Sequence, residues 1–344
     1  MIIATQWNCM HSWVVYVRVQ KTGSALFESE LLTRLVARAY GNVTPNGCGY
    51  GQCGCQSRQT FYAEEFKANL RGDRRPCANA LCTERLGLCT RWAARRPKGV
   101  TILGYGGMHL AVQDAERLLV RHVPAARALW VTWLREPLAR TLSEFYHTHW
   151  RSRINHVRAT VGWDWVFSEG ACGNYTLRHW LLCSGAAPGA ANRMVRMLSG
   201  RSFVVKPLEP TETSGALARA GLPHGLAQRP LGEDDLASAR TNLRQRFAWF
   251  GLLECAPASL WALHRLLGVP WRGAESASEL GAMPVRSNAS ATRHIDLATL
   301  QRTDPRAVEL LREQNSLDVD LYSFATGLLG ERLERDGWAG GACV

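Results

Sequence analysis

The sequence predicts an α/β fold with a mostly parallel central sheet and helices on both faces. Short segments rich in β-branched and aromatic residues alternate with longer segments of helical periodicity, which is the pattern of strand–helix–strand units. The strand candidates are apolar over most of their length, as is typical of buried strands. With 344 residues, 46% of them hydrophobic, the chain is long enough for a sizeable core, and we expect one domain over residues 1–344.

The first strand–turn–helix unit spans residues 13–39 and carries the first candidate site. Residues 14–19 predict a buried strand, and the spacing of apolar residues from Ala25 onward predicts a helix with one apolar face. Between them lies a polar turn made of Gln20, Lys21, Thr22, Gly23 and Ser24. Free N–H groups at the start of a helix, with a lysine and hydroxyls beside them, favour binding of a phosphate or sulfate.

This turn is not a Walker A loop. That motif needs G-x-x-x-x-G-K-[ST], whereas the order here is Lys21-Thr22-Gly23 with no leading glycine. An ordinary turn between a strand and a helix explains the segment equally well when it is taken alone. A second polar turn later in the chain favours the anion-binding interpretation.

The middle of the chain predicts an irregular insertion and then two further strands. Residues 41–96 are rich in Gly, Cys and Arg with little periodicity, so we expect a Cys-rich insertion held by disulfides. Residues 100–103 predict a short strand, which leads through Gly107-Met108-His109 into a predicted helix over residues 110–122. Residues 128–134 predict the next buried strand.

The second polar turn follows that strand as Arg135-Glu136-Pro137. Proline at the first helical position predicts a helix from there to about residue 149. Arg135 then lies at the carboxyl edge of the sheet, where open α/β sheets bind ligands. Arg140 and Ser143 share a helix face, and an arginine fork with a hydroxyl suits a second phosphate. Two such sites suit a nucleotide phosphorylated at both ends; the alternative is a structural ion pair at Arg135 and an ordinary helix residue at Ser143.

The rest of the chain continues the alternation. Residues 233–246 and 257–267 predict helices, and residues 247–252 predict a strand between them. A polar loop is expected over residues 285–294, and one or two closing helices over residues 305–335. No internal repeat is visible.

The charge predicts an acidic partner. The chain carries 41 Lys and Arg against 29 Asp and Glu, a net charge of +12, so nucleic acid, a nucleotide, an anionic membrane or an acidic polysaccharide are the candidate partners. The alternative is a merely arginine-rich surface. No apolar run of about 20 residues predicts a membrane span, and no signal peptide is visible.

The cysteines favour an oxidising compartment. There are 11 of them, six between Cys48 and Cys89, and no pair has the spacing of a zinc ribbon. Such spacing fits disulfides of a secretory compartment better than a metal site. The N-x-[ST] sequons at Asn42, Asn174 and Asn288 point the same way. The alternative is a cytosolic protein with reduced cysteines; a lumenal protein would need an anchor or signal that this sequence does not display.

An ordered set of motifs resembles the Golgi polysaccharide sulfotransferases, and most closely the heparan sulfate 6-O-sulfotransferases. The motifs run through nearly the whole chain in the family's order: Gln20-Lys21-Thr22-Gly23 after a strand, Gly107-Met108-His109, Leu134-Arg135-Glu136-Pro137 with Arg140 and Ser143-Glu144, Asn192-Arg193, Arg196-Met197-Leu198, residues 247–252 followed by Glu254, Asn315-Ser316-Leu317-Asp318, and Leu321-Tyr322. The resemblance implies a P-loop-NTPase-like sulfotransferase fold.

The resemblance also implies a reaction: transfer of a sulfuryl group from PAPS (3′-phosphoadenylyl sulfate) to a hydroxyl of an acidic polysaccharide, expected at the 6-O position of a hexosamine in a heparan-like chain. By that resemblance the protein would be a Golgi-lumenal glycoprotein with disulfide bonds. It would use no metal and bind no nucleic acid, and any membrane association would come only through an anchor outside this sequence. A Cys172–Cys183 disulfide is implied in the same way.

Site residues carry over by the same resemblance. The first turn, Gln20 to Ser24, would hold the 5′-phosphosulfate, and Arg135 and Ser143 would hold the 3′-phosphate. Thr292 and Arg293 would close over the cofactor. His109 would be the catalytic base and Lys21 would stabilise the charge of the transition state, roles that suit a neutral imidazole and an ammonium group. His147 and Trp150 would face the acceptor sugar; packing at a helix end is their alternative.

Two departures from the family pattern bear on activity. The first turn continues with Ser24-Ala25-Leu26 where the family has further hydroxyls, which removes donors to the cofactor. His109 is followed by Leu110-Ala111-Val112-Gln113 instead of an acidic, Trp-containing segment, so the acceptor can differ. The alternatives are a 2-O-type uronosyl sulfotransferase and a non-catalytic polyanion-binding relative. A kinase or other P-loop NTPase would need a Gly-rich loop and a metal-binding carboxylate, and the sequence has neither.

Overall fold

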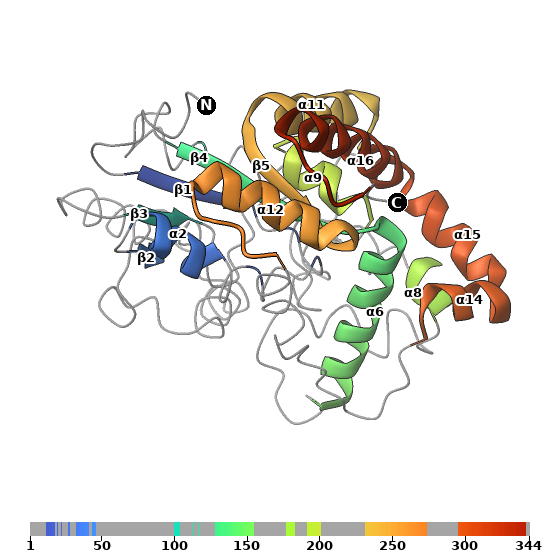
Figure 1. Ribbon diagram of the computed structural model, residues 1–344. Helices are drawn as coiled ribbons and strands as arrows, with labels where there is room; N and C mark the ends of the chain where they lie inside the picture. Colours follow the sequence, from blue (N-terminus) through green and yellow to red (C-terminus); the bar gives the residue numbers. More distant parts are fainter. Residues whose placement is uncertain are drawn as a thin grey trace, which may run out of the picture.

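The computed structural model describes part of the chain, namely residues 12–17, 19, 22, 27, 32–40, 43–45, 100–103, 112, 116, 128–154, 177–182, 191–200, 231–273 and 295–341. Within these residues a single sheet lies between layers of helices (Figure 1). The predicted α/β class is therefore confirmed. None of the described helices is both long and apolar enough to cross a membrane.

In the part of the chain that the structure describes, the sheet has five strands, and every neighbouring pair is parallel. Its spatial order is β2-β3-β1-β4-β5. The strands are β1 (Ser12–Val17), β2 (Val43–Pro45), β3 (Val100–Leu103), β4 (Ala128–Leu134) and β5 (Phe247–Leu252). Since β1 and β4 are central and buried on both faces, they have to be apolar almost throughout, as their sequences are.

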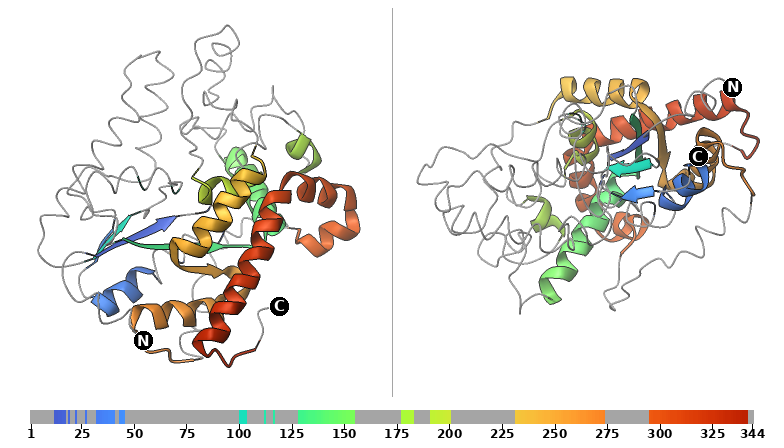
Figure 2. Two further views of the ribbon diagram at one scale, coloured as in Figure 1. Left: turned by 90° about the horizontal axis from the view of Figure 1, so that it is seen from above. Right: turned by 90° about the vertical axis from the view of Figure 1, so that its left-hand side faces the viewer.

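One face of the sheet is covered by α9 (Arg193–Leu198), α11 (Glu233–Gln245) and α16 (Ser316–Asp336). The core on this face forms between these helices and one side of the sheet. The strand residues that contribute to it come from β1, β4 and β5: Val15, Val17, Trp130, Leu134, Phe247 and Phe250. Figure 2 shows α11 and α9 on this side and α2 and α12 on the other.

The opposite face is covered by α2 (Thr33–Tyr40) and α12 (Ala256–Leu267). Phe27, from the segment that follows β1, stacks on Trp133 and Trp249, with ring centroids 4.9 and 5.2 Å away. Gly251 is required here, because a Cβ at this position would lie 2.5 Å from two ring atoms of Trp133. This aromatic cluster fixes Phe27 against the sheet and so anchors the chain after the first turn.

A third group of helices packs together: α6 (Pro137–Ile154), α8 (Leu177–Leu182), α14 (Leu297–Thr303) and α15 (Pro305–Gln314). Leu138, Leu142 and Phe145 of α6 are buried against them. Since α6 follows β4 directly, this group lies beyond the carboxyl edge of the sheet (Figure 1).

The strand order creates a switch point between β1 and β4. From β1 the chain builds β2 and β3 on one side of it, and then returns to build β4 and β5 on the other. The hydroxyl of Thr132 in β4 donates to the carbonyl of Val17 at the end of β1, at 2.8 Å. The turns that leave these two strands therefore start side by side, which is where open α/β sheets form their ligand crevice.

Most predicted boundaries agree with the structure. The strands over residues 100–103, 128–134 and 247–252 are confirmed. Helix α6 begins at Pro137 as predicted but continues to Ile154, because no glycine or proline follows before Gly162. Strand β2, inside the stretch predicted to be irregular, was not expected, and neither was α14.

Candidate functional site at the carboxyl edge of the sheet

Many of the predicted site residues lie outside the described part of the chain: Gln20, Lys21, Gly23, Ser24, His109, Thr292 and Arg293. The same holds for Cys172 and Cys183. His147 and Trp150 lie in the second half of α6, whose backbone is described. The site is therefore built from Thr22, Arg135, Ser143 and the residues around them.

The first turn is closed by its own threonine. Thr22 is buried, and its hydroxyl donates to the carbonyl of Val19 at 3.0 Å. Val19 itself is buried in the core beside α9 and α11. The Thr22 hydroxyl therefore donates its hydrogen bond within the turn, whereas the sequence predicted that this hydroxyl would donate to a ligand.

The second turn is fixed by two carboxylates. Glu136 accepts hydrogen bonds from the N–H groups of Leu138 and Ala139, at 3.1 and 2.6 Å, and so caps the helix that it precedes. Glu254, from the turn after β5, accepts from the N–H of Glu136 at 3.1 Å. Because the first amides of α6 already have an anionic partner, an anion at this turn would have to be held by the Arg135 side chain and not by the helix terminus.

Arg135 is half-buried at the end of β4. Burial lowers the pKa of Arg135, while the nearby carboxylates of Glu254 and Glu136 oppose this by favouring the charged form. An arginine remains protonated at neutral pH in such surroundings. Ser143 is partly exposed two turns along α6. The two residues predicted to hold one phosphate thus retain access to solvent at the carboxyl edge of the sheet.

Arg140 has a different position from the one that the sequence predicted. Its side chain is fully buried, and its guanidinium donates to the carboxylate of Glu144 and to the hydroxyl of Thr141, each at 2.8 Å. Glu144 also pairs with Arg193 of α9 at 2.9 Å. Glu144 therefore joins α6 to α9, and Arg140 is held inside the protein beside it, so an arginine fork for an anion at this edge would have to come from Arg135.

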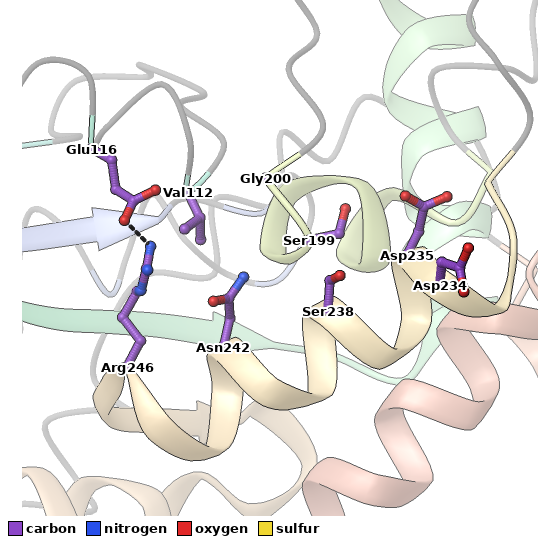
Figure 3. Close-up of a pocket in the computed structure, with 9 residues that line it drawn as sticks. All are labelled: Val112, Glu116, Ser199, Gly200, Asp234, Asp235, Ser238, Asn242 and Arg246. Atoms are coloured by element: carbon purple, nitrogen blue, oxygen red, sulfur yellow. Dashed lines mark ion pairs between the residues drawn. The ribbon is translucent and has the colours of Figure 1, made fainter.

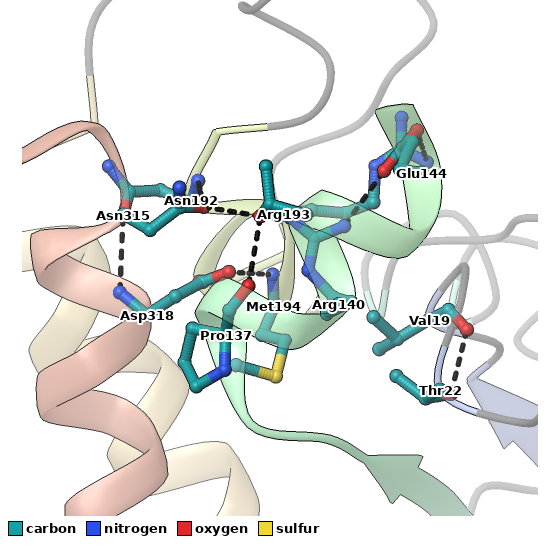
Figure 4. Close-up of polar contacts among 11 residues, drawn as sticks. Val19, Thr22, Pro137, Arg140, Glu144, Asn192, Arg193, Met194, Asn315 and Asp318 are labelled. Atoms are coloured by element: carbon teal, nitrogen blue, oxygen red, sulfur yellow. Dashed lines mark hydrogen bonds and ion pairs between the residues drawn. The ribbon is translucent and has the colours of Figure 1, made fainter. Parts of the chain in front are cut away.

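Two further residues hold α9 in place. Asp318 of α16 is buried and accepts from the N–H of Met194 at 3.1 Å (Figure 4). It also accepts from the N–H of Val195, at 2.8 Å. It therefore caps α9 from another helix, which matters because the N-cap residue Asn192 makes no side-chain cap of its own. The side chain of Asn192 instead accepts from the N–H of Asp318, at 3.1 Å.

Asn315 links the same elements. Its side-chain oxygen accepts from the N–H of Asn192 at 3.3 Å and from the hydroxyl of Thr141 at 3.1 Å.

Burial also shifts the pKa values of the charged residues in this network. It lowers the pKa of Arg193 to about 10 and raises the pKa of Asp318, although Arg140 and the two N–H groups that Asp318 accepts from oppose the rise. Helices α6, α9 and α16 are thus joined by a buried network of opposite charges, which includes Glu144, the residue after Ser143 in the sequence.

Apart from Arg140, the sequence singled out Glu144, Arg193, Asn315 and Asp318 only by family resemblance and gave them no role. A signal was present, because a charged residue stands among apolar ones at Arg193 and Asp318, and fully buried charges need partners. Identifying the partners required the structure, since Asp318 lies more than 120 residues from Met194 in the chain.

A cavity of about 320 Å³ lies along α11, and none of the predicted site residues lines it (Figure 3). Four of its polar residues are already engaged: Arg246 pairs with Glu116 at 2.5 Å, Asn242 donates to the carbonyl of Leu198 at 2.7 Å, and Asp235 accepts from the N–H of Gly232 at 3.0 Å. We therefore do not regard it as the functional site.

Among the described residues, no three His, Cys, Asp or Glu side chains gather closely enough to hold a metal ion. Cys255, in the short turn Leu253–Cys255 that follows β5, is disulfide-bonded. No protein-family model matches the chain, and no curated protein matches its sequence.

Proposed function

We propose that the chain is a PAPS-dependent carbohydrate sulfotransferase that sulfates an acidic polysaccharide, with the 6-O position of a hexosamine in a heparan-like chain as the expected acceptor. The observation that carries the proposal is the strand order. It brings the turns after β1 and β4, the two turns predicted to bind anions, to one switch point. A nucleotide with phosphoryl groups at both ends requires such a pair of sites in one crevice.

The second site supports the proposal through its composition. Arg135 offers a charged fork at the end of β4, and Ser143 offers a hydroxyl on the helix that follows. The parallel sheet and its strand–turn–helix opening are compatible with the P-loop-NTPase-like sulfotransferase fold, which we include in the proposal. Disulfide bonding at Cys255 supports a lumenal location, in the Golgi by family resemblance.

In the proposed reaction the acceptor hydroxyl oxygen attacks the sulfur of PAPS in line. The bond between sulfur and the 5′-phosphate oxygen breaks, and adenosine 3′,5′-bisphosphate (PAP) leaves. His109 takes the hydroxyl proton, and Lys21 with the amides of the first turn stabilises the charge on the sulfuryl oxygens and the leaving phosphate. Arg135 and Ser143 bind the 3′-phosphate.

The remaining proposed contacts involve α6 and the chain before α14. His147 and Trp150 of α6 would face the acceptor sugar. Thr292 and Arg293 would contact the cofactor; the chain is next described at Ile295, whose N–H donates to the hydroxyl of Tyr146 at 3.1 Å. Tyr146 lies one turn beyond Ser143 on α6, so Ile295 itself contacts the helix that carries the second predicted site.

Calorimetric titration of PAP into the purified chain, with ATP as the comparison ligand and in moderate salt, tests the proposal. We expect PAP to bind without added metal and ATP to bind much more weakly. A folded chain that binds no PAP, but binds heparin in a strongly salt-dependent manner, would instead identify a polyanion-binding protein. Analysis of the sulfated position in the product separates 6-O from 2-O transfer.

A further inference from the structure

Glu254 links three elements beside the second anion site. It lies in the short turn Leu253–Cys255 that follows β5, and β5 is the neighbour of β4 with Leu252 opposite Leu134. One of its carboxylate oxygens accepts from the N–H of Glu136, at 3.1 Å. The other accepts from the hydroxyl of Tyr322 in α16, at 2.5 Å. Both oxygens of this carboxylate are thus used within the protein.

The hydrogen bond from the N–H of Glu136 to Glu254 restricts the backbone next to Arg135. The N–H of Glu136 and the carbonyl of Arg135 belong to one rigid peptide plane, so holding that N–H restricts the backbone rotation that aims the Arg135 side chain. The Glu254 carboxylate also lies near enough to the guanidinium to favour its charged form. A single carboxylate therefore holds the backbone that follows Arg135 and favours the charged form of its guanidinium.

Tyr322 in turn orients Glu254. The phenol is half-buried, and burial together with Glu254 raises the pKa of Tyr322, so it stays protonated and donates throughout the physiological pH range. Without this donor the carboxylate would be free to rotate, since it stands at the surface and the remaining hydrogen bond fixes only one of its oxygens.

We propose that Tyr322 and Glu254 are positioning residues that preorganise Arg135, and that they thereby set the preference of the site for nucleotides carrying a 3′-phosphate. This inference rests on the proposed function. It assigns a role to two residues that touch neither the nucleotide nor the acceptor. They act by lowering the conformational entropy that the Arg135 side chain would otherwise lose on binding a phosphate.

The test compares PAP with adenosine 5′-monophosphate, which lacks only the 3′-phosphate, in calorimetric titrations of Tyr322→Phe. We expect the Kd for PAP to rise about 5-fold, the equivalent of one hydrogen bond, and the Kd for the monophosphate to stay unchanged. Glu254→Gln should cause the same selective loss. In an Arg135→Ala background, Tyr322→Phe should have no further effect, because its action passes through Arg135.

Thr326→Val is the matched control. It removes a hydroxyl from the same helix, one that donates only to the carbonyl of Tyr322 at 3.0 Å, and it should leave both affinities unchanged. Equal weakening of PAP and the monophosphate by Tyr322→Phe, or additive effects with Arg135→Ala, would overturn the inference while leaving the proposed function intact. Absence of PAP binding to the wild-type chain would overturn both.

Discussion

Replacing Asp318 by Asn tests whether the buried network is held together by charge. The substitution preserves shape but leaves only one oxygen for the two N–H groups of Met194 and Val195. The new amide group then faces an N–H donor, and one charge-assisted hydrogen bond, worth about 1.5–3 kcal/mol, is lost. Arg140 and Arg193 also lose a countercharge, which increases the cost.

Asp318→Asn also removes the cost of burying a charge, and this partly offsets the loss of stability. Both oxygens of Asp318 accept N–H groups, which favours the ionised form, whereas burial raises the pKa of Asp318 and so makes ionisation costly. Removing the charge returns part of that cost. We therefore expect a net loss of about 2 kcal/mol in the free energy of unfolding, a large share of the 5–15 kcal/mol typical of a domain.

Urea unfolding followed by tryptophan fluorescence measures this loss, since the chain has 13 tryptophans. With an m value of about 2–3 kcal/mol/M, the midpoint should fall by roughly 0.7–1 M while m stays constant. Asp320→Asn, an exposed position on the same helix, is the control and should leave the midpoint unchanged. If Asp318→Asn behaved like this control, the carboxylate would be neutral in the folded protein and the charge-based reasoning would be refuted.

Four further predictions follow from the site and the core. His109→Ala should abolish sulfuryl transfer and leave PAP affinity unchanged, because the base touches only the acceptor; near-normal turnover would exclude it as the base. Arg135→Ala should weaken PAP binding by about 2–3 kcal/mol, roughly 30- to 160-fold in Kd by calorimetry, and an unchanged Kd would remove Arg135 from the site. Gly251→Ala should cost about 1–3 kcal/mol in urea unfolding, because its methyl group would overlap the buried Trp133 ring; wild-type stability would show that the ring can move. The raised pKa of Tyr322 means that the unfolded chain loses the phenol proton first, so stability from this group is complete below the ordinary tyrosine pKa of about 10 and is lost as pH rises above it. Urea midpoints of Tyr322→Phe should therefore fall less steeply than wild type between pH 8 and pH 10.5, and parallel slopes would contradict this.

Local patterns were sufficient to predict the elements of the sheet core. The strands over residues 128–134 and 247–252 are continuous apolar runs because both of their faces are buried, and Pro137 marks the start of α6. Strand β2 is only three residues long and includes a proline, and α14 buries a single leucine, Leu300. Neither segment carries enough periodicity to be recognised before the chain is folded.

The candidate site was predictable in part. The two polar turns were found as separate motifs, but their adjacency follows from a strand order that no local pattern contains. Arg140 was misplaced because α6 is buried on several sides at its start, so its periodicity does not reveal which arginine faces solvent. The cap on α9 joins Asp318 to residues far away in sequence, and only the folded chain brings them together.

The cap that Asp318 provides also has a consequence for the order of folding. Helix α9 has only six residues, too few to be stable alone, yet it contributes Met194, Val195, Met197 and Leu198 to the core beneath the sheet. Its N-terminal amides are satisfied only when α16 is docked, and α16 is made more than 100 residues later. During synthesis the apolar residues of α9 therefore remain incompletely packed until α16 has left the ribosome. We expect a chaperone that shields exposed apolar surface to have most effect at this stage.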